Sequence, residues 1–516
     1  MKKFSVLSLL ATLLIATNVG FAQDQFDLRD YAKDGGSSKN YLTSVKNQGQ
    51  FGICWTYAAS AAMESNILLK GISGGNTPNI SEWHMANYAT HRPDSQYHKD
   101  NVSTQWGGFW FYSVDYIANG HGPINESYAV RPTTPGSDDT YLKYKPALDL
   151  PKMDYFMRSS IRVERNEYGS GQAGDDAYHA AIKNLIKTHG AVHTAYHAST
   201  DTVGTVTSIG SNSSPAVTKV HAYHETGQNA QGANHAVAIV GWAKDVTYTV
   251  NGVTRTADCW LIKNSWGAGS SATTNGYHYL PFDATGGTGD PHFGGVNAYD
   301  MEVGKKYNNV VRNGLPTKIS YMLDYRGDNN SDASSHEWAA AKMQSNGQYI
   351  ESIGVWSNYT GKDIKIGIFS SLQDLKDNNA VYVEDFAGDS VKGFTVLDLA
   401  KKIKIDGEYF IAYSIRDGNQ TLNREFLFKL YDESSDYAGT VAGENLIFRE
   451  DNGKLVQTQD LKDYEVTFTG NNAPNVYDGA VGVVAYTNEV PEPATLLILF
   501  GGSAGIFMRR KRKNAA

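Results

Sequence analysis

Four residues of types that cooperate in covalent catalysis lie in strong local contexts along this chain of 516 residues. Cys54 is embedded in GQFGICWTYAAS, His235 opens the apolar run HAVAIVGW, and Asn264 follows the run CWLIK. A thiol attacks as the thiolate, so it needs a base, and the base needs an orienting partner. Gln48, six residues before Cys54, carries a side-chain amide that can donate to an oxyanion. The four residues therefore predict a cysteine nucleophile with its base, its orienter and an oxyanion donor.

The elements predicted around these residues could bring them together. Small and apolar residues over 52–70 predict a buried helix with Cys54 near its start. A helix N-terminus favours a thiolate through its free N–H groups and its dipole. The apolar runs that begin at His235 and end just before Asn264 predict adjacent buried strands. Such strands would carry both side chains to the start of the helix.

The rest of the chain divides into a part with helices and a part rich in strands. Further helices are predicted over 109–118 and 177–187, whereas the polar stretch 199–233 predicts a loop with at most one strand. After about residue 310, alternating runs separated by turn signals predict a β-sandwich. These runs are 363–369, 403–405, 409–413 and 445–448. We place the domain boundary between 300 and 315.

The N-terminus has the features of a secretory signal peptide. Basic residues open the chain, an apolar run follows, and Gly20 and Ala22 are small residues at the spacing that a signal peptidase cuts. The alternative is a membrane anchor, but the run is shorter than the ~20 residues needed to span a bilayer. We therefore expect a signal peptide over 1–22, removed by signal peptidase.

Composition excludes several other classes of protein. Two cysteines cannot form a disulfide framework, and Cys259, within an apolar strand, is predicted to be a buried structural thiol. The net charge is −8, and basic residues cluster only at the C-terminus, which argues against a nucleic-acid partner. The remaining histidines, such as His193 and His224, have no catalytic context and are predicted to be surface or core residues. No residue spacing indicates a metal site or a cofactor.

Three segments resemble papain-like cysteine peptidases, in the order in which that family carries them. VKNQGQFGICWTYAAS resembles the active-site segment, NHAVAIVGW the histidine segment and WLIKNSWG the asparagine segment. Weaker matches fill the interval: Ser81–Glu82, WGGFWFYSVDYIANGHGPINESY and AIKNLIKTHGAV. The resemblance covers about residues 26 to 300. It implies an α+β papain-like two-lobed peptidase over 23–305, with a helical left lobe and a β right lobe.

The resemblance also implies a role for each catalytic residue. Cys54 would be the nucleophile, and His235 would pair with it as an imidazolium and later protonate the leaving amine. Asn264 would hold the His235 ring. The Gln48 side chain and the Cys54 backbone N–H would form the oxyanion hole.

Three further residues would shape the substrate site. Gly107 and Gly108 match the strip that hydrogen-bonds an extended substrate backbone, where side chains would obstruct the approach. Trp266, counted with the substrate-binding residues, would shield the hydrogen bond between His235 and Asn264 from water.

The chain departs from the family pattern in two places. Phe51 stands where the family usually has a disulfide-bonded cysteine, so the bridge is absent and aromatic packing is the expected replacement. Only about 25 residues separate the predicted cleavage site from Gln48, so we expect no long inhibitory pro-segment there.

The strand-rich part, 315–488, resembles the lectin-like β-sandwich that follows the peptidase domain in some bacterial surface-layer cysteine proteases. This implies a jelly-roll-like domain that could hold calcium or recognise an envelope polysaccharide. Oxygen ligands for calcium could come from Asp324, Asp328 and Asp332, although a solvated polar loop is the favoured interpretation.

The C-terminal segment 490–516 resembles a bacterial PEP-CTERM sorting signal. Val490 to Pro493 carry the match, a short apolar run follows over 494–508, and a basic cluster ends the chain. The basic cluster would stay cytoplasmic. The resemblance implies processing by an exosortase-like membrane enzyme during export to the cell envelope or extracellular matrix. The alternative is an ordinary C-terminal anchor.

Together these features predict a secreted cysteine peptidase that hydrolyses protein or peptide substrates and associates only transiently with the membrane. Endopeptidase action is favoured because no blocking insertion is visible. The alternative is a surface-binding or matrix protein in which the peptidase fold persists without turnover.

Overall fold

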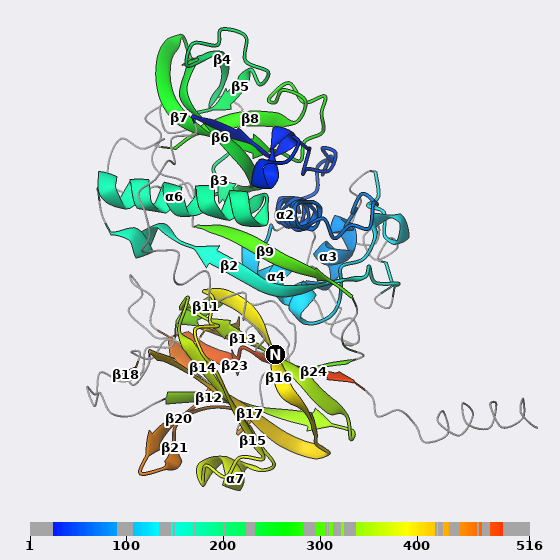
Figure 1. The fold of residues 1–516 in the computed structure, drawn as a ribbon, viewed down its shortest axis with the longest axis vertical. Coiled ribbons are helices and arrows are strands. Elements are labelled where there is room, and N and C mark those ends of the chain that lie inside the picture. Colours follow the sequence, from blue (N-terminus) through cyan, green and yellow to red (C-terminus); the bar gives the residue numbers. More distant parts are fainter. Residues whose placement is uncertain are drawn as a thin grey trace, which may run out of the picture.

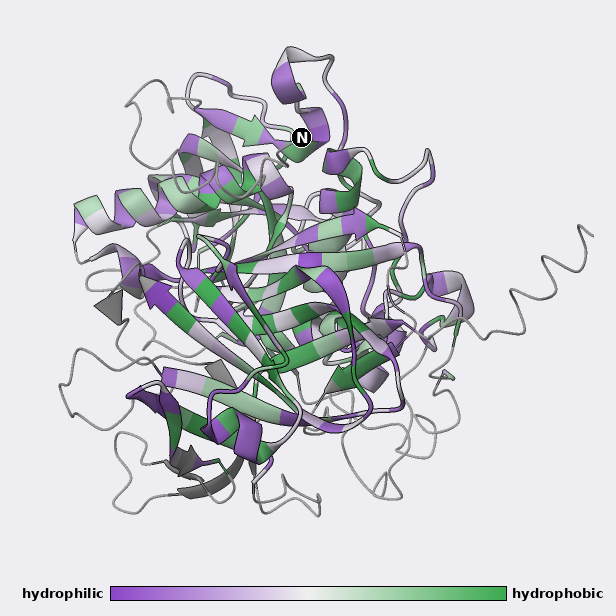
Figure 2. Ribbon diagram, turned by 60° about the horizontal axis from the view of Figure 1, so that its bottom comes forward, coloured by the Kyte–Doolittle hydropathy of each residue, from purple (hydrophilic) through white to green (hydrophobic). Residues whose placement is uncertain are grey.

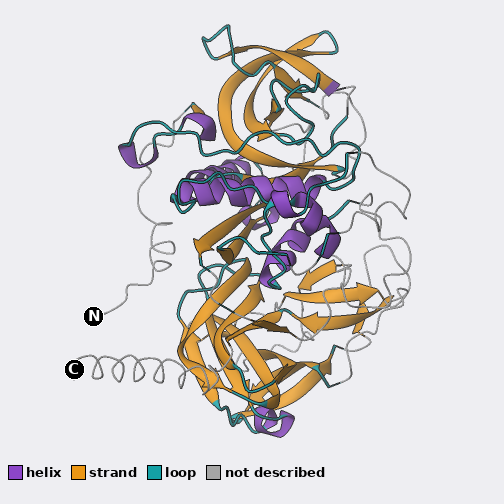
Figure 3. Ribbon diagram, turned by 90° about the vertical axis from the view of Figure 1, so that its right-hand side faces the viewer, coloured by secondary structure: helices purple, strands orange, loops and turns teal. Residues whose placement is uncertain are grey.

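The chain forms a two-lobed α+β part followed by a β-sandwich, as predicted (Figure 1). Figure 3 shows most helices gathered in one band between strands above and strands below. The computed structural model describes residues 24–89, 107–133, 146–147, 150–169, 171–199, 202–222, 233–282, 295–304, 307, 309–312, 321–324, 337–417, 420–421, 427–432, 443–461, 464–466 and 475–488. None of the helices in these ranges is long and apolar enough to cross a membrane.

The helices lie mostly in the first part of the chain. The α-helices are α2 (Cys54–Lys70), α3 (Glu82–Tyr88), α4 (Trp110–Ala118), α6 (Gln172–His189) and α7 (Leu372–Lys376). Short 3-10 helices are η1 (Leu28–Asp30), η2 (Lys33–Gly35), η3 (Glu126–Tyr128) and η4 (Arg165–Tyr168).

The strands fall into three sheets. Those of the first part are β1 (Gln25–Asp27), β2 (Tyr155–Val163), β3 (Val192–Tyr196), β4 (Val203–Ile209), β5 (Lys219–His221), β6 (His235–Val250), β7 (Val253–Lys263), β8 (Tyr277–Pro281) and β9 (Val296–Val303). Those of the second part are β10 (Asn309–Arg312), β11 (Tyr321–Asp324), β12 (Glu337–Ser345), β13 (Tyr349–Ser357), β14 (Asp363–Phe369), β15 (Tyr382–Phe386), β16 (Gly393–Lys404), β17 (Gly407–Asp417), β18 (Gln420–Thr421), β19 (Leu427–Asp432), β20 (Asn445–Asp451), β21 (Lys454–Asp460), β22 (Tyr464–Val466), β23 (Asn475–Val481) and β24 (Val483–Asn488).

Helix α2 is buried on nearly all sides, as its small residues allow. Its alanines permit close packing against β3, β6 and β9, and polar residues such as Glu64 and Asn66 are buried with them. Gly71 ends the helix in a left-handed conformation at φ 68°, with its N–H donating to the carbonyls of Ile67 and Leu68. The predicted helix 52–70 is therefore confirmed, and it begins at Cys54 itself.

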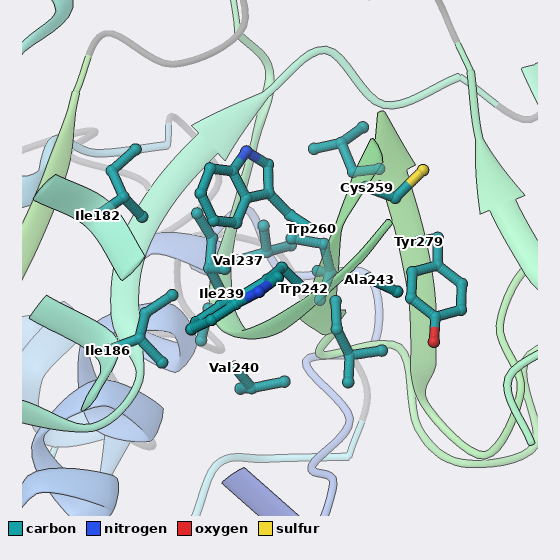
Figure 4. Close-up of a cluster of buried hydrophobic side chains, with 14 of the residues drawn as sticks. Ile182, Ile186, Val237, Ile239, Val240, Trp242, Ala243, Cys259, Trp260 and Tyr279 are labelled. Atoms are coloured by element: carbon teal, nitrogen blue, oxygen red, sulfur yellow. The ribbon is translucent and has the colours of Figure 1, made fainter. Parts of the chain in front are cut away.

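A small closed ring of strands forms the β lobe. Strands β6, β4, β5, β8 and β7 pair in that order, and β7 returns to pair with β6. Its core packs against α6, where Ile182 and Ile186 face Trp260 and Trp242 (Figure 4). Cys259 belongs to the same core with 0% exposure and no disulfide, as predicted.

The second part is a sandwich of facing sheets. Strands β10, β24, β13 and β16 lie in order on one side, and β15, β14, β17, β12, β20 and β21 form the other sheet. Side chains alternate along the strands: Ile364, Ile366 and Ile368 of β14 enter the core between the sheets. The same alternation gives the banded strands of Figure 2. A third, four-stranded sheet contains β11, β19, β23 and β22.

The two parts share one sheet. Strand β16 of the sandwich pairs with β2, so thirteen strands run from one part into the other. Aromatic packing covers this junction: the ring centroids of Trp110 and Trp356 lie 6.2 Å apart, and the Tyr486 hydroxyl donates to the Ala118 carbonyl at 2.8 Å. Strand β9 pairs with β2 of the first part, whereas β10 pairs with β24 of the second part. The chain therefore passes from the first part into the second between residues 303 and 309. The domain limits 305 and 315 stay predictions.

Two sequence predictions need correction in detail. Helix α6 begins at Gln172, five residues before the predicted start, because the polar first turn carries no apolar periodicity. The stretch 199–233 contains two strands, β4 and β5, rather than at most one. Their polar residues are tolerated because β4 exposes alternate side chains, and the pairing is supplied by β6 and β8. The helix predicted over 109–118 is confirmed as α4.

The pairing of β16 with β2 is predicted to depend on Gly393. Its φ is 121°, and an added Cβ would lie 2.2 Å from the Ser160 carbonyl oxygen. Gly393→Ala should therefore loosen the sandwich from the first part, giving a separate low-temperature transition in calorimetry. The matched control is Gly388→Ala, which also has positive φ (69°) but no atom within 4 Å, and should show only the conformational strain, about 1 kcal/mol. Equal losses of Tm in both variants would contradict this dependence.

Candidate active site

Cys54 is the first residue of α2 and lies at the boundary of the two lobes. Its side chain is half-buried, and its Sγ accepts a hydrogen bond from the Ala236 backbone N–H at 3.3 Å. Ile53 precedes the helix without a side-chain cap, so no polar side chain competes for the N–H groups of the first turn. The sulfur therefore lies at the start of the helix and beside the first residues of β6.

His235 and Asn264 meet as predicted, because β6 and β7 pair antiparallel. His235 Nε2 lies 2.8 Å from Asn264 Oδ1, and that oxygen also accepts from the Ser265 backbone N–H at 2.7 Å. An amide oxygen can only accept, so Nε2 of His235 carries a proton. The neutral ring then has its lone pair on Nδ1. Both side chains are buried, at 7% and 3% exposure.

Trp266 covers this pair. Its ring stacks on the His235 imidazole, with centroids 4.7 Å apart and planes inclined by 26°. The stacking fits the shielding role expected for Trp266, because it excludes water from one face of the imidazole.

Gln48 is fixed by two neighbours. Its Nε2 donates to the Phe51 carbonyl at 2.9 Å, and its Oε1 accepts from the Ser265 hydroxyl at 2.6 Å. The Gln48 backbone N–H also donates to the Ser265 carbonyl at 2.7 Å. One Nε2 hydrogen stays available for another acceptor. Ser265, adjacent to Asn264, therefore links the predicted oxyanion donor to the histidine's partner.

Burial dominates the protonation of Cys54 and His235. Burial raises the pKa of the Cys54 thiol, although backbone N–H groups, including that of Ala236, act to lower it. Burial also lowers the pKa of His235 to about 4, and the hydrogen bond to Asn264 offsets this only in part. Both directions favour a neutral thiol and a neutral imidazole. The imidazolium–thiolate pair implied by the resemblance is thus opposed by burial, and the backbone donors are the local contribution in its favour.

The two predicted backbone-binding glycines lie beside the helix start. Gly107 has φ 77° and open space around it. Gly108 packs against the Trp55 indole, because a Cβ there would lie 2.4 Å from Trp55 Nε1. The absence of a side chain at Gly108 is therefore required by the packing of the residue next to Cys54, a reason that the sequence did not reveal.

Aromatic packing replaces the missing disulfide, as expected. Phe51 is 1% exposed, its ring lies edge-on to Trp83 at 5.5 Å, and the Arg131 guanidinium lies 4.8 Å above the Phe51 ring. Ile53, Tyr57 and Ala86 complete this small cluster.

A buried ionic cluster beneath the site was not predicted from the sequence. Lys46 Nζ lies 2.7 Å from Glu82 Oε1 and 3.3 Å from Glu64 Oε1. Burial acts to lower the pKa of Lys46, but the neighbouring carboxylates outweigh it and raise that pKa. Thr43 extends the cluster: its hydroxyl donates to Glu64 Oε2 at 2.5 Å, and Lys263 Nζ donates to the Thr43 carbonyl at 2.9 Å. Ionic partners this far apart in sequence have no common local pattern.

Histidines other than His235 also lie near the site. His221 and His278 are buried in the β lobe, with the His221 ring 5.8 Å from that of Trp266, and His193 is a core residue, as predicted. No spacing in the sequence links His221 or His278 to Cys54, so nothing local could have identified them. His224 lies outside the described residues.

Several predictions concern segments that the structure describes only in part. The signal peptide and the tail 490–516 lie outside the described residues, as do Asp328 and Asp332. Asp324 is the last residue of β11. Across the described ranges, no group of three or more His, Cys, Asp or Glu side chains is arranged to hold a metal ion. The calcium interpretation stays a prediction.

Known protein families match both the first part and the tail. The family model described as papain family cysteine protease matches residues 22–287, just over half of the chain. The PEP-CTERM protein-sorting motif matches residues 489–513.

Curated relatives match about half of this chain. A cathepsin L-like protein of Caenorhabditis elegans is 24% identical over 247 residues, which is 48% of this chain and 56% of that protein. Pro-cathepsin H of Bos taurus is 26% identical over 241 residues, 46% of this chain and 55% of that protein. The chain thus spans about half the length of the curated relatives it matches.

A solved structure matches both parts of the fold. The cysteine protease and lectin-like domains of Cwp84, a surface layer associated protein of Clostridium difficile, superpose with a TM-score of 0.61 at 16% identity, covering 87% of each chain. At this identity the similarity concerns the fold, and it extends across the peptidase-like part and the sandwich. With the family match over residues 22–287, the chain belongs to the papain family of cysteine proteases.

Proposed function

We propose that this protein is an exported cysteine peptidase that cleaves peptide bonds with Cys54 as nucleophile and His235 as base. The observation that carries the proposal is the arrangement of Cys54, His235 and Asn264. Sγ of Cys54 accepts a hydrogen bond from the backbone N–H of Ala236, the residue after His235, and His235 Nε2 is hydrogen-bonded to Asn264 Oδ1. This leaves Nδ1 of the imidazole as the nitrogen that can exchange a proton with the thiol.

In the first half of the reaction, the thiol proton passes to His235 Nδ1 as Sγ attacks the substrate carbonyl carbon. The carbonyl oxygen becomes an oxyanion, which Gln48 Nε2–H and the Cys54 backbone N–H would stabilise. Proton transfer coupled to attack suits a site where burial disfavours both separate charges.

In the second half, the tetrahedral intermediate collapses and the carbon–nitrogen bond breaks. The His235 imidazolium gives its proton to the leaving amine, and a thioester remains on Cys54. Water then attacks the thioester, His235 accepts a proton from that water, and the free acid and thiol are released.

The location of the protein follows from its tail. A PEP-CTERM motif ahead of a short apolar run supports recognition by a membrane-bound sorting enzyme. The apolar residues 494–508 would extend only ~22 Å as a helix at 1.5 Å per residue, less than the ~30 Å hydrocarbon core. In this part of the proposal, the protein is exported to the cell envelope, loses its tail and acts on envelope or extracellular proteins.

Replacing the nucleophile should abolish hydrolysis. Cys54→Ala removes the sulfur that is hydrogen-bonded to the Ala236 N–H, next to His235, so turnover of a peptide library should fall to the background of a mock preparation, with the fold retained by circular dichroism. Cys259→Ala is the matched control, because this thiol is buried in the β lobe, and it should stay active. Turnover by Cys54→Ala would refute the assignment. A wild-type protein that neither hydrolyses peptides nor reacts with an epoxide inhibitor of thiol peptidases would be the idle surface protein instead.

Gln48→Ala should lower kcat by roughly 10²–10³, the loss typical of one oxyanion donor, and leave KM nearly unchanged. Ser265→Ala is the control, because it removes the hydroxyl that bonds Gln48 Oε1 and keeps the Nε2 donor. Its kcat should fall much less. An effect of Gln48→Ala on KM alone would show that Gln48 binds substrate rather than the oxyanion.

Mass spectrometry of the protein taken from its native envelope should find no peptides from Arg509 to Lys513. Cleavage near the Pro-Glu-Pro step is expected because the following apolar run is too short for a stable span. Recovery of these basic peptides in the mature pool would instead indicate a retained anchor.

A further inference from the structure

A column of four rings extends from the candidate base into the β lobe. Trp266 lies between two imidazoles, with ring centroids 4.7 Å from His235 and 5.8 Å from His221. His221 in turn stacks on His278, at 3.8 Å and with 18° between the planes. Tyr196 lies alongside, with its ring within 6 Å of all three histidines. His221, His278 and Tyr196 are each at most 1% exposed.

The hydrogen bonds in this column have one consistent direction. His221 Nε2 lies 2.9 Å from the Ala272 carbonyl oxygen, which can only accept, so Nε2 carries the proton. His221 Nδ1 is then an acceptor, and the Tyr196 hydroxyl donates to it at 2.8 Å. The Tyr196 oxygen accepts in turn from His278 Nε2 at 3.3 Å. The direction therefore runs from His278 through Tyr196 to His221 and the Ala272 carbonyl.

This arrangement requires both imidazoles to be neutral. A proton on His221 Nδ1 would face the Tyr196 hydroxyl and remove the acceptor for its hydrogen. A proton on His278 Nδ1 would be buried with no acceptor among the described residues. Burial accordingly lowers the pKa of His221 to about 4 and that of His278 well below its ordinary value.

The groups that face His221 come from several elements. They are His278 on β8, Tyr196 on β3, His235 on β6 and, beyond Tyr196, the Cys54 thiol on α2. A positive charge on His221 lowers the pKa of His235, because like charges repel. A charged His221 would therefore oppose the transfer of the Cys54 proton to His235.

The column also affects the position of the His235 ring. The register of β3 and β6 places Tyr196 directly opposite His235. Trp266 is held between His221 and His235, while Asn264 holds the edge of the His235 ring at Nε2. The plane of the candidate base is thus fixed by Asn264 at one edge and by the stacked rings across one face.

We propose that His221, His278 and Tyr196 are positioning residues, which hold the His235 imidazole in its reactive orientation through Trp266. The inference rests on the proposed function, in which His235 takes the Cys54 proton.

The test is the pH dependence of peptide hydrolysis by the exported His221→Phe protein. Phenylalanine keeps a flat ring in the column, but it cannot accept from Tyr196 and cannot become charged. At neutral pH we expect kcat to fall about 10- to 10²-fold with KM unchanged, as for a misplaced reacting group. The acid limb of kcat/KM should also move to higher pH, because the His221 charge that lowers the pKa of His235 no longer develops. A purely structural defect would lower the profile at every pH without moving that limb.

His179→Phe is the matched control. His179 is another buried histidine of the same lobe, it has a pKa lowered to about 4 by burial, and it packs on Trp260 and Phe282. This variant should keep the wild-type kcat and acid limb. If His221→Phe matches His179→Phe in both measurements, the positioning role is refuted.

A second variant covers the case in which His221→Phe does not fold. Tyr196→Phe removes only the hydroxyl that joins the two histidines, and we expect a several-fold loss of kcat with KM unchanged. An unaltered kcat in Tyr196→Phe would overturn the inference.

Failure of the proposed function gives a different result. If the wild-type protein hydrolyses no peptides, peptidase action is refuted. The positioning role of the ring column would then be tested by alkylating Cys54 with iodoacetamide, which reacts with the thiolate. The pH profile of alkylation should shift in Tyr196→Phe or His221→Phe, whichever is folded, relative to His179→Phe. Superimposable alkylation profiles would overturn the inference.

Discussion

The Lys46 ammonium lies between the carboxylates of Glu64 and Glu82, and this buried ionic contact joins the segments on which the site depends. Lys46 comes from the segment that carries Gln48, Glu64 from the third turn of α2, and Glu82 from the start of α3. Removing one partner of such a cluster leaves an uncompensated buried charge, at a typical cost of ~3–5 kcal/mol. Because the other end of α2 bears Cys54, the ionic cluster fixes the candidate nucleophile relative to Gln48, the candidate oxyanion donor.

The same cluster reaches the β lobe through Thr43. Lys263 Nζ donates to the carbonyl and hydroxyl of Thr43, and the next residue along the chain is Asn264. The strand that orients the candidate base is thereby tied to the segment before Gln48. These polar contacts join the segment before Gln48 to α2, α3 and β7.

Burial at the lobe boundary has a consequence for stability as well as for chemistry. It lowers the pKa of His193 to about 3 and those of His221 and His235 to about 4, from an ordinary value of 6.5. Between these values the unfolded chain binds protons that the folded chain excludes. The stability that depends on neutral rings is therefore complete above about pH 6.5 and is lost progressively as the pH falls toward 4. An acid environment would weaken the fold through the same rings that surround the candidate base.

The sequence by itself determined the candidate catalytic residues, the helix that begins at Cys54, the strands that carry His235 and Asn264, and the sandwich, because each depends on a local pattern of period or spacing. The tertiary structure alone decided the ionic cluster of Lys46, the ring column of His221 and His278, and the pairing of β16 with β2. These contacts join residues distant in the chain whose neighbours carry no shared periodicity. Their partners are set by how strands and helices pack, and no single segment contains that information.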